Sequence, residues 1–215
     1  MDHYRHSMLF NCRDLSITLV GCGGIGAATA LALAKMGVGE LNIWDADVVD
    51  PINLATQMHR LLDVEKYKVD AVKEMLAEFS DDTEVLTDCR RVTAEDRLYN
   101  YIVISAVDSI QARKDIWEAV CRGGVSYYLD ARMAAEEFHL HVIDMNGDVS
   151  WYDTMLVAET DENVSEEPCT SKATIYCSFL SAAILGKTIR QIATNERPPR
   201  IFIQNLRNDA LTVIP

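Results

Sequence analysis

The sequence predicts an α/β protein built on a doubly wound, mostly parallel sheet, and three observations indicate this fold class. Short apolar runs rich in β-formers alternate with stretches of helical periodicity over residues 1–130. Residues 101–106 (Tyr-Ile-Val-Ile-Ser-Ala) are almost continuously apolar, which is typical of a strand buried on both faces of a parallel sheet. The glycine-rich turn 21–26 (Gly-Cys-Gly-Gly-Ile-Gly) separates a strand from a helix, as in nucleotide-binding α/β sheets.

The elements of the first half follow in βαβα order. Residues 16–20 are short and β-rich, and the helix after the glycine turn is expected over 27–36. The segment 67–79 has apolar residues at spacings of three and four, which predicts a helix. The other expected elements are strands at 40–44, 84–86, 101–106 and 125–129 and a helix at 110–121. This order is that of a Rossmann-like fold.

The second half predicts an antiparallel extension of the sheet. Residues 138–143 alternate with period two, Asn146-Gly147-Asp148 signals a turn, and 149–152 is expected to return as a strand. The remaining expected segments are an acidic loop at 159–168, a helix at 174–192 and a hairpin of strands 200–204 and 211–214. We expect one domain over 1–215, with a nucleotide-binding half (1–130) and a second half (131–215) holding the extension, the acidic crossover loop and the C-terminal helix.

Composition narrows the class of partner. The 215 residues are 49% hydrophobic, which suffices for one full core. The net charge of −13 argues against non-specific binding to nucleic acid or to anionic membranes. The six cysteines include no C-x-x-C pair, the N-terminus is polar, and the most apolar stretch, 173–185, is too short to span a bilayer. We therefore expect a cytoplasmic protein with reduced thiols and with no nucleic-acid or membrane partner.

The glycine turn and the strand after it predict an adenine nucleotide. Glycines let the backbone approach a phosphate, and the free N–H groups of the following helix favour an anion. Asp45 comes directly after the strand 40–44, where a carboxylate can accept hydrogen bonds from ribose hydroxyls. These features alone do not separate ATP from NAD.

The segment after this strand sharpens the prediction. Residues 45–57 read DADVVDPINLATQ. With the glycine turn, this segment resembles the ThiF/MoeB/HesA group within the superfamily of ubiquitin-activating enzymes. The pattern of that family is a G-x-G-G-x-G loop, then D-x-D-x-V, then N-L-x-R-Q, then a lysine before the next helix and an x-x-D-N-x-x-x-R segment. The matching residues are Gly21, Gly23, Gly24, Gly26, Asp45, Asp47, Val48, Asn53, Leu54, Gln57, Lys68, Asp108 and Arg113.

The resemblance implies ATP-dependent adenylation of the C-terminal carboxylate of a small ubiquitin-like or sulfur-carrier protein. By this analogy, the glycine loop lies along the phosphates and Asp45 holds the ribose. Asn53 and Lys68 contact the phosphates, and Asp108 holds Mg²⁺. Lysine and Mg²⁺ would offset the charge that develops when a carboxylate attacks the α-phosphate.

Two further candidates come from the resemblance. Arg5 resembles an N-terminal arginine that in this family reaches the ATP of the partner in a homodimer. Cys169, between Pro168 and Thr170, follows the adenylation motifs as the thioester cysteine of activating enzymes does. A helix after it would favour the thiolate, whereas the acidic residues before it would oppose ionisation. The alternative is a buried or capping cysteine, and Cys22 and Cys177 are expected to be structural.

The chain also departs from the family. The arginine of N-L-x-R-Q is replaced by Thr56, and Arg60, one turn further on if the segment is helical, is a candidate to replace its charge. Ser109 stands in place of the asparagine after the magnesium aspartate, and the paired C-x-x-C motifs of the sulfur-carrier branch are missing.

Each candidate also has a structural interpretation. Asp45 and Asp47 are alternatively turn acids, Lys68 a solvated helix residue, Asp108 the N-cap of the next helix, and Arg113 a partner of a nearby acid. At the level of function, the alternatives to an adenylyltransferase are a scaffold that keeps the fold without the chemistry and an NAD(P)-dependent oxidoreductase. The D-x-D-x-V and N-L-x-x-Q segments have no role in the latter.

Overall fold

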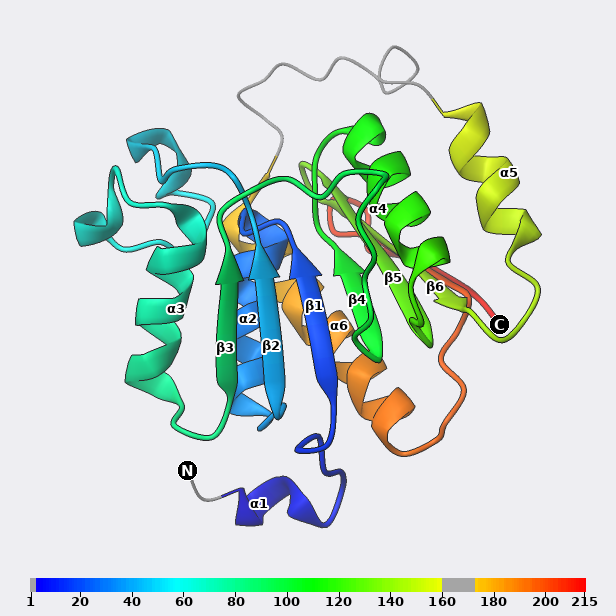
Figure 1. The fold of residues 1–215 in the computed structure, drawn as a ribbon, viewed down its shortest axis with the longest axis horizontal. Helices are drawn as coiled ribbons and strands as arrows, with labels where there is room; N and C mark the ends of the chain where they lie inside the picture. The colour runs from blue at the N-terminus through cyan, green and yellow to red at the C-terminus, as the bar shows by residue number, and fades with distance from the viewer. Residues whose placement is uncertain (1–2, 160–172) are drawn as a thin grey trace.

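A mixed eight-stranded sheet forms the centre of the computed structural model, which describes residues 3–159 and 173–215 (Figure 1). The strand order is β3-β2-β1-β4-β5-β6-β7-β8. The pairs among the first five strands are parallel, and β5 to β8 pair antiparallel. The strands are β1 (Ser16–Val20), β2 (Glu40–Trp44), β3 (Glu84–Asp88), β4 (Ile102–Ser105), β5 (Tyr127–Ala134), β6 (Glu137–Asp144), β7 (Ile201–Asn205) and β8 (Ala210–Ile214).

Helices cover both faces of this sheet, as doubly wound folds require. The α-helices are α1 (Tyr4–Ser7), α2 (Gly24–Lys35), α3 (Lys68–Phe79), α4 (Ile110–Arg122), α5 (Ser150–Ala158) and α6 (Ile175–Ala193), and the short 3₁₀ helices are η1 (Pro51–Asn53) and η2 (Leu61–Asp63). Successive side chains of a strand point to opposite faces of the sheet, so the sheet has a core on each face. Ile102 and Ile104 pack with α2, α3 and α6, whereas Val103 packs with α4 and α5.

The sequence predicts most of these elements. The expected strands 16–20 and 40–44 coincide with β1 and β2, and the final hairpin is confirmed as β7 and β8. The helix after the glycine turn begins at Gly24 rather than at residue 27, so α2 starts inside the loop itself. Strand β5 begins two residues later than expected and runs on to Ala134, because Ala131 and Met133 pair with β6.

The expected strand at 149–152 is wrong. The turn at 145–147 forms, but the chain then enters α5 instead of returning as a strand. Asp148 accepts hydrogen bonds from the backbone N and the hydroxyl of Ser150, which directs the chain into a helix. Tyr152 and Leu156, four residues apart, are then buried together on the α4 face of the sheet. The antiparallel extension consists of β6, β7 and β8.

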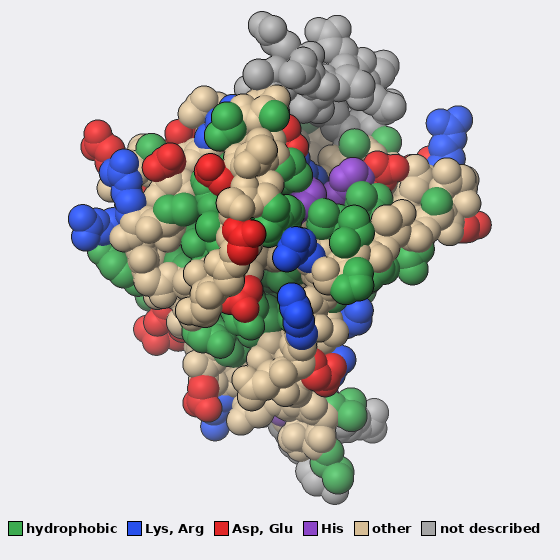
Figure 2. All heavy atoms as spheres, turned by 90° about the vertical axis from the view of Figure 1, so that its right-hand side faces the viewer, with side chains coloured by type: hydrophobic (Ala, Val, Ile, Leu, Met, Phe, Trp, Pro, Cys, Tyr) green, Lys and Arg blue, Asp and Glu red, His purple; other side chains and the backbone are tan. Residues whose placement is uncertain are grey.

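Strand β8 ends the sheet opposite β3 and, among the described residues, pairs only with β7. Its apolar side chains Leu211, Val213 and Ile214 are exposed. Figure 2 looks onto this end of the molecule and shows hydrophobic side chains interspersed with basic and acidic ones.

Candidate functional site

The glycine loop lies at the carboxyl edge of β1, between the ends of β2 and β4, where sheets of this type bind ligands. Gly21 has φ +100°, and a Cβ there would lie 2.5 Å from the carbonyl oxygen of Ala106. A Cβ on Gly26 would lie 1.8 Å from the carbonyl oxygen of Gly21. The protein's own packing therefore requires glycine at both positions.

Gly23 differs from these two. Among the described residues, a Cβ on Gly23 would meet only the Nε2 of Gln57, at 3.7 Å. Gly23 is also the N-cap of α2 and offers no side chain to its N–H groups. An open surface above uncapped N–H groups is what an approaching anion requires.

Asp45 joins the glycine loop to the turn after β2. Its Oδ2 accepts a hydrogen bond of 2.6 Å from the backbone N of Cys22, and its Oδ1 accepts one of 2.8 Å from the N of Asp47. Burial raises the pKa of Asp45, and these two hydrogen bonds and the Lys68 charge oppose that rise. Asp45 is a turn acid, as its structural interpretation predicts, and its oxygens keep lone pairs for a further donor.

Lys68, the first residue of α3, is a buried cation and not a solvated helix residue. It is 8% exposed, and its Nζ lies 3.0 Å from the Oδ2 of the exposed Asp47. Its backbone N also donates to the carbonyl of Asp47 at 2.9 Å. The pair places one ammonium group beside the carboxyl ends of β1 and β2.

His59 belongs to this cluster, although none of the sequence motifs includes it. The ring is 7% exposed, and its Nε2 donates to the carbonyl oxygen of Cys22 at 3.0 Å. Burial lowers the pKa of His59, so the ring is neutral at pH 7. Its position two residues after the N-L-x-x-Q segment is the signal that could have selected it.

The segment with Asn53 and Gln57 packs over the loop. The Oδ1 of Asn53 accepts from the N of Asp50 at 3.2 Å, which helps to cap η1. The Oε1 of Gln57 is buried and has no hydrogen-bond partner among the residues that the structure describes. This unpaired amide oxygen, on a side chain that lies beside the open side of Gly23, is available to a hydrogen-bond donor of a ligand.

Arg60, the candidate to replace the charge of the family arginine at position 56, is engaged by carboxylates. The guanidinium of Arg60 is bonded to Asp63 and Glu78 and lies 3.4 Å from Glu74. The Asp63 and Glu78 carboxylates hold the pKa of Arg60 above its usual value. Arg60 is therefore part of a surface network between η2 and α3, and its role in supplying the missing charge stays a prediction.

Asp108 lies beyond the end of β4, where its carboxylate is exposed. The cap of α4 is Ser109, whose Oγ accepts from the N of Ala112 at 3.0 Å, so the N-cap interpretation of Asp108 is wrong. No described residue forms a hydrogen bond with the Asp108 side chain. Arg113 is 4% exposed and pairs with Asp130, as its structural interpretation predicts.

The residues present fit a magnesium ion that arrives with a nucleotide. Residues 3–159 and 173–215 contain no group of three or more His, Cys, Asp or Glu side chains that could hold a metal alone. Mg²⁺ on nucleotides needs only one or two carboxylates, since phosphates and waters supply the other ligands. Asp108 is a free carboxylate of this kind.

Two candidates fall outside this geometry. Cys169 lies outside the described residues, as does the side chain of Arg5, whose backbone belongs to α1. Cys22 and Cys177 are buried, and burial raises the pKa of both thiols, that of Cys177 to about 11. These two cysteines are structural, as expected.

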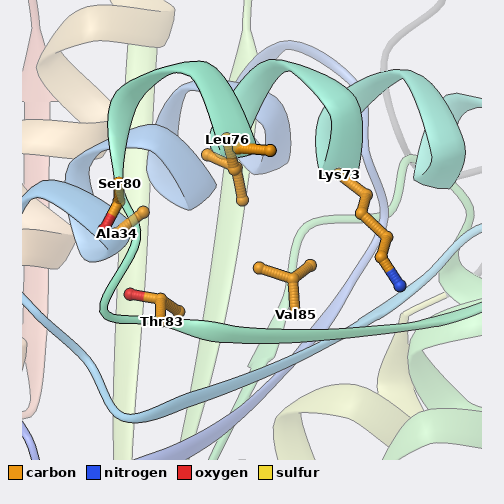
Figure 3. A pocket seen from close by; sticks show the side chains of 7 residues that line it. Ala34, Lys73, Leu76, Ser80, Thr83 and Val85 are labelled. Carbon is orange, nitrogen blue, oxygen red and sulfur yellow. The ribbon is translucent and has the colours of Figure 1, made fainter.

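A separate cleft of about 180 Å³ lies between α2, α3 and β3 (Figure 3). Its lining is mainly aliphatic, with Lys73 at one end. It contains none of the predicted site residues. No helix in the described part of the chain is long and apolar enough to cross a membrane.

Known proteins with similar sequences include an adenylyltransferase and a dehydratase by name. The adenylyltransferase and sulfurtransferase MOCS3 of Aedes aegypti is 34% identical over 103 residues, which cover 46% of this chain and 24% of MOCS3. The tRNA threonylcarbamoyladenosine dehydratase of Bacillus subtilis is 35% identical over 104 residues, 46% of this chain and 41% of the dehydratase. The chain thus matches less than half the length of either relative.

Solved structures and a family model extend the similarity to nearly the whole chain. PaaA has a TM-score of 0.74 at 20% identity, and E. coli MccB with ATP has 0.72 at 16%; each match covers 94% of this chain and 64% of the other. At these identities the likeness shows the fold alone. The model of the ThiF family matches residues 4–212. The chain therefore belongs to the ThiF family.

Proposed function

We propose that this protein is an ATP-dependent adenylyltransferase that activates the C-terminal glycine carboxylate of a small ubiquitin-like or sulfur-carrier protein. One observation supports the proposal: the open glycine loop, Asp45, Lys68 and Asp108 all follow the carboxyl ends of the neighbouring strands β1, β2 and β4 or pair with residues that do. The adenylyltransferases among its relatives and the ATP-bound MccB of the same fold support ATP over NAD.

Each residue has a role in the proposed reaction. The N–H groups at the start of α2 and the Lys68 ammonium hold the phosphates, with the Asn53 and Gln57 amides as further polar contacts. Asp45 accepts hydrogen bonds from the ribose, and Asp47 holds the Lys68 ammonium in place. The substrate carboxylate attacks the α-phosphate, pyrophosphate leaves, and an acyl-adenylate forms. Magnesium held by Asp108 would neutralise phosphate charge during this step.

The charge of the chain favours a protein substrate over tRNA. The dehydratase relative acts by name on a tRNA nucleoside, but a net charge of −13 repels a polyanion. A small protein with basic residues near a glycine C-terminus fits better. We further propose a homodimer, with Arg5 reaching the ATP of the partner, and Cys169 as the thiol that accepts the acyl group.

The test is ATP–pyrophosphate exchange with small glycine-ended proteins encoded near the gene. We expect exchange only when a partner is present, and a loss of at least about 100-fold in Lys68→Ala and Asp108→Asn. Lys66→Ala is the matched control, because this nearby lysine pairs with Glu74 and is expected to keep exchange. NADH should not compete with ATP. Wild-type protein that is inactive with every partner would reject the proposal.

The variant Cys169→Ala distinguishes activation of the substrate carboxylate from transfer of the acyl group to the thiol. If Cys169 accepts the acyl group, this variant keeps exchange but loses a covalent adduct that a thiol reductant cleaves. Exchange with no such adduct in the wild-type protein would leave Cys169 without this role.

One observation favours a second candidate, a scaffold that binds a partner protein without adenylation and binds little ATP. Thr56 replaces the family arginine, and Arg60 is bound to carboxylates elsewhere. The scaffold predicts a partner complex that is insensitive to Lys68→Ala and shows no exchange. Exchange that is unchanged in Arg60→Ala would show that the reaction needs neither arginine.

A further inference from the structure

A buried charge cluster centred on Asp130 lies beside the turn that carries Asp108. Asp130 is 0% exposed, and its register partners are Ser105 of β4 and His141 of β6. An unpaired carboxylate at such a site would be strongly unfavourable. The partners of Asp130 therefore decide what the cluster does.

Asp130 is held by three donors. Its Oδ1 accepts from the Nη1 of Arg113, and its Oδ2 accepts from the Nε of Arg132 at 2.7 Å and from the hydroxyl of Tyr152 at 2.9 Å. Burial alone would raise the pKa of Asp130, but the two guanidinium charges hold it below its usual value. Burial lowers the pKa of the adjacent His141 to about 4, so this ring adds no charge at pH 7.

Arg113 extends from Asp130 to the backbone of the β4–α4 turn. While one side of its guanidinium holds Asp130, its Nη2 donates to the carbonyl oxygen of Val107, the residue just before Asp108. Its Nη1 also donates to the carbonyl of Ala131 at 3.2 Å. One rigid, planar group thus fixes the turn against β5.

Arg132 extends from Asp130 in the opposite direction. Its Nη1 donates to both oxygens of Glu159, each at 2.8 Å, and the Nζ of Lys114 donates to the Glu159 carbonyl at the same distance. Glu159 is the C-cap that follows the last residue of α5. The two arginines and two carboxylates are matched in charge and join the Asp108 turn to the end of α5.

We propose that Asp130 is a positioning residue, which acts through Arg113 to hold the Asp108 turn in the geometry that binds the metal–nucleotide complex. The inference rests on the proposed function, because it assigns Asp108 to the metal. A buried ion pair is by itself weak evidence for stability. Groups behind a metal ligand, by contrast, orient it and change metal affinity by about 10–100-fold when they are lost.

The experiment compares Asp130→Asn, Arg113→Lys and Asp63→Asn with the wild-type full chain. Arg113→Lys keeps the charge but lacks the rigid planar fork, whose two separate terminal nitrogens hold Asp130 and the Val107 carbonyl. Asp63→Asn is the control, because Asp63 is 1% exposed and bonded to Arg60 in the same way, at η2. The readouts are Mn²⁺ binding with a non-hydrolysable ATP analogue, measured by electron paramagnetic resonance, and deuterium uptake at residues 106–109.

We expect Asp130→Asn and Arg113→Lys to weaken Mn²⁺ binding about tenfold and to speed deuterium uptake in the turn. Asp63→Asn lowers the melting temperature with neither effect. If Asp130→Asn does not fold, Arg113→Lys decides. Wild-type Mn²⁺ affinity in the folded variants, or uptake equal to that of the control, overturns the inference. A wild-type chain that binds no Mn²⁺–nucleotide complex rejects the proposed function instead, and the uptake result remains a separate test.

Discussion

At the residue scale, Gly23 and Gly26 belong to one loop but meet different requirements. Gly26 faces the backbone of Gly21, whereas Gly23 faces open space among the described residues. Sequence reasoning identifies both as parts of one motif and cannot separate packing from ligand approach, since that difference depends on neighbours far along the chain. The contact of Asp45 could not be predicted for the same reason, because the backbone N of Cys22 that donates to it belongs to another segment of the chain.

The two glycines give a matched pair of variants. Gly26→Ala is expected to prevent folding or to destabilise the protein by more than about 3 kcal/mol, because its Cβ meets backbone that cannot move aside. Gly23→Ala is expected to change stability by less than about 1 kcal/mol while weakening ATP binding. Thermal unfolding and nucleotide titration measure the two effects. Full ATP affinity in Gly23→Ala would remove this loop from the proposed site.

The hydrogen bonds between Asp96 and Arg90 predict that the stability of the protein depends on pH. The Asp96 carboxylate accepts two hydrogen bonds from Arg90, which lower its pKa in the folded protein. The stabilisation is therefore present above the unfolded pKa, about 3.9, and is lost as the pH falls below it. Asp96→Asn should cost about 1–2 kcal/mol at pH 7, and its difference from wild type should shrink between pH 4 and pH 2. A constant difference in urea unfolding across this range would contradict the prediction.

At the element scale, the sequence predicts those elements whose signal is local. The apolar run of β4 and the helical periodicity of α3 and α4 are of this kind. The 149–152 segment was misread because its apolar residues fit a short strand and a helix equally well, and the burial of Tyr152 beside Asp130 decides between them. His59 and the Asp130 cluster could not be predicted, because their partners come from other elements.

Two adjacent residues at the start of α4 are expected to have different roles, Ser109 in stability and Asp108 in the reaction. Ser109→Ala removes the cap of the helix and is expected to cost about 1 kcal/mol with little change in exchange. Asp108→Asn removes no hydrogen bond from a described residue and should leave the melting temperature unchanged while exchange is lost. Differential scanning calorimetry and the exchange assay test both. A large loss of stability in Asp108→Asn would indicate a structural role for this residue.

At the scale of the whole molecule, the C-terminal half completes the core of the first half. Helix α6 packs against α2 and contributes Cys177, Leu185 and Ile189 to the same cluster as Ile17 and Leu19 of β1 (Figure 1). The Oγ of Ser178 donates to the carbonyl of Thr56, on the segment beside the glycine loop. The second half thus contributes directly to the surroundings of the proposed nucleotide site.

This packing predicts a single cooperative unfolding transition for the chain. A fragment of residues 1–134 would expose the face of α2 that α6 covers and should not fold alone. Circular dichroism and urea titration of the fragment test this expectation. A fragment with a sigmoidal transition of its own would show that residues 1–134 form an independent domain.

The free edge of β8 has a practical consequence for work with the purified protein. Exposed Leu211, Val213 and Ile214 on an edge strand favour edge-to-edge pairing between molecules. Samples should therefore self-associate with increasing concentration, and this association would conceal the proposed homodimer in sizing experiments. A lysine at position 213 places a charge on the exposed side of this strand without disturbing the core. Val213→Lys is thus the background in which the stoichiometry of the native assembly is best measured.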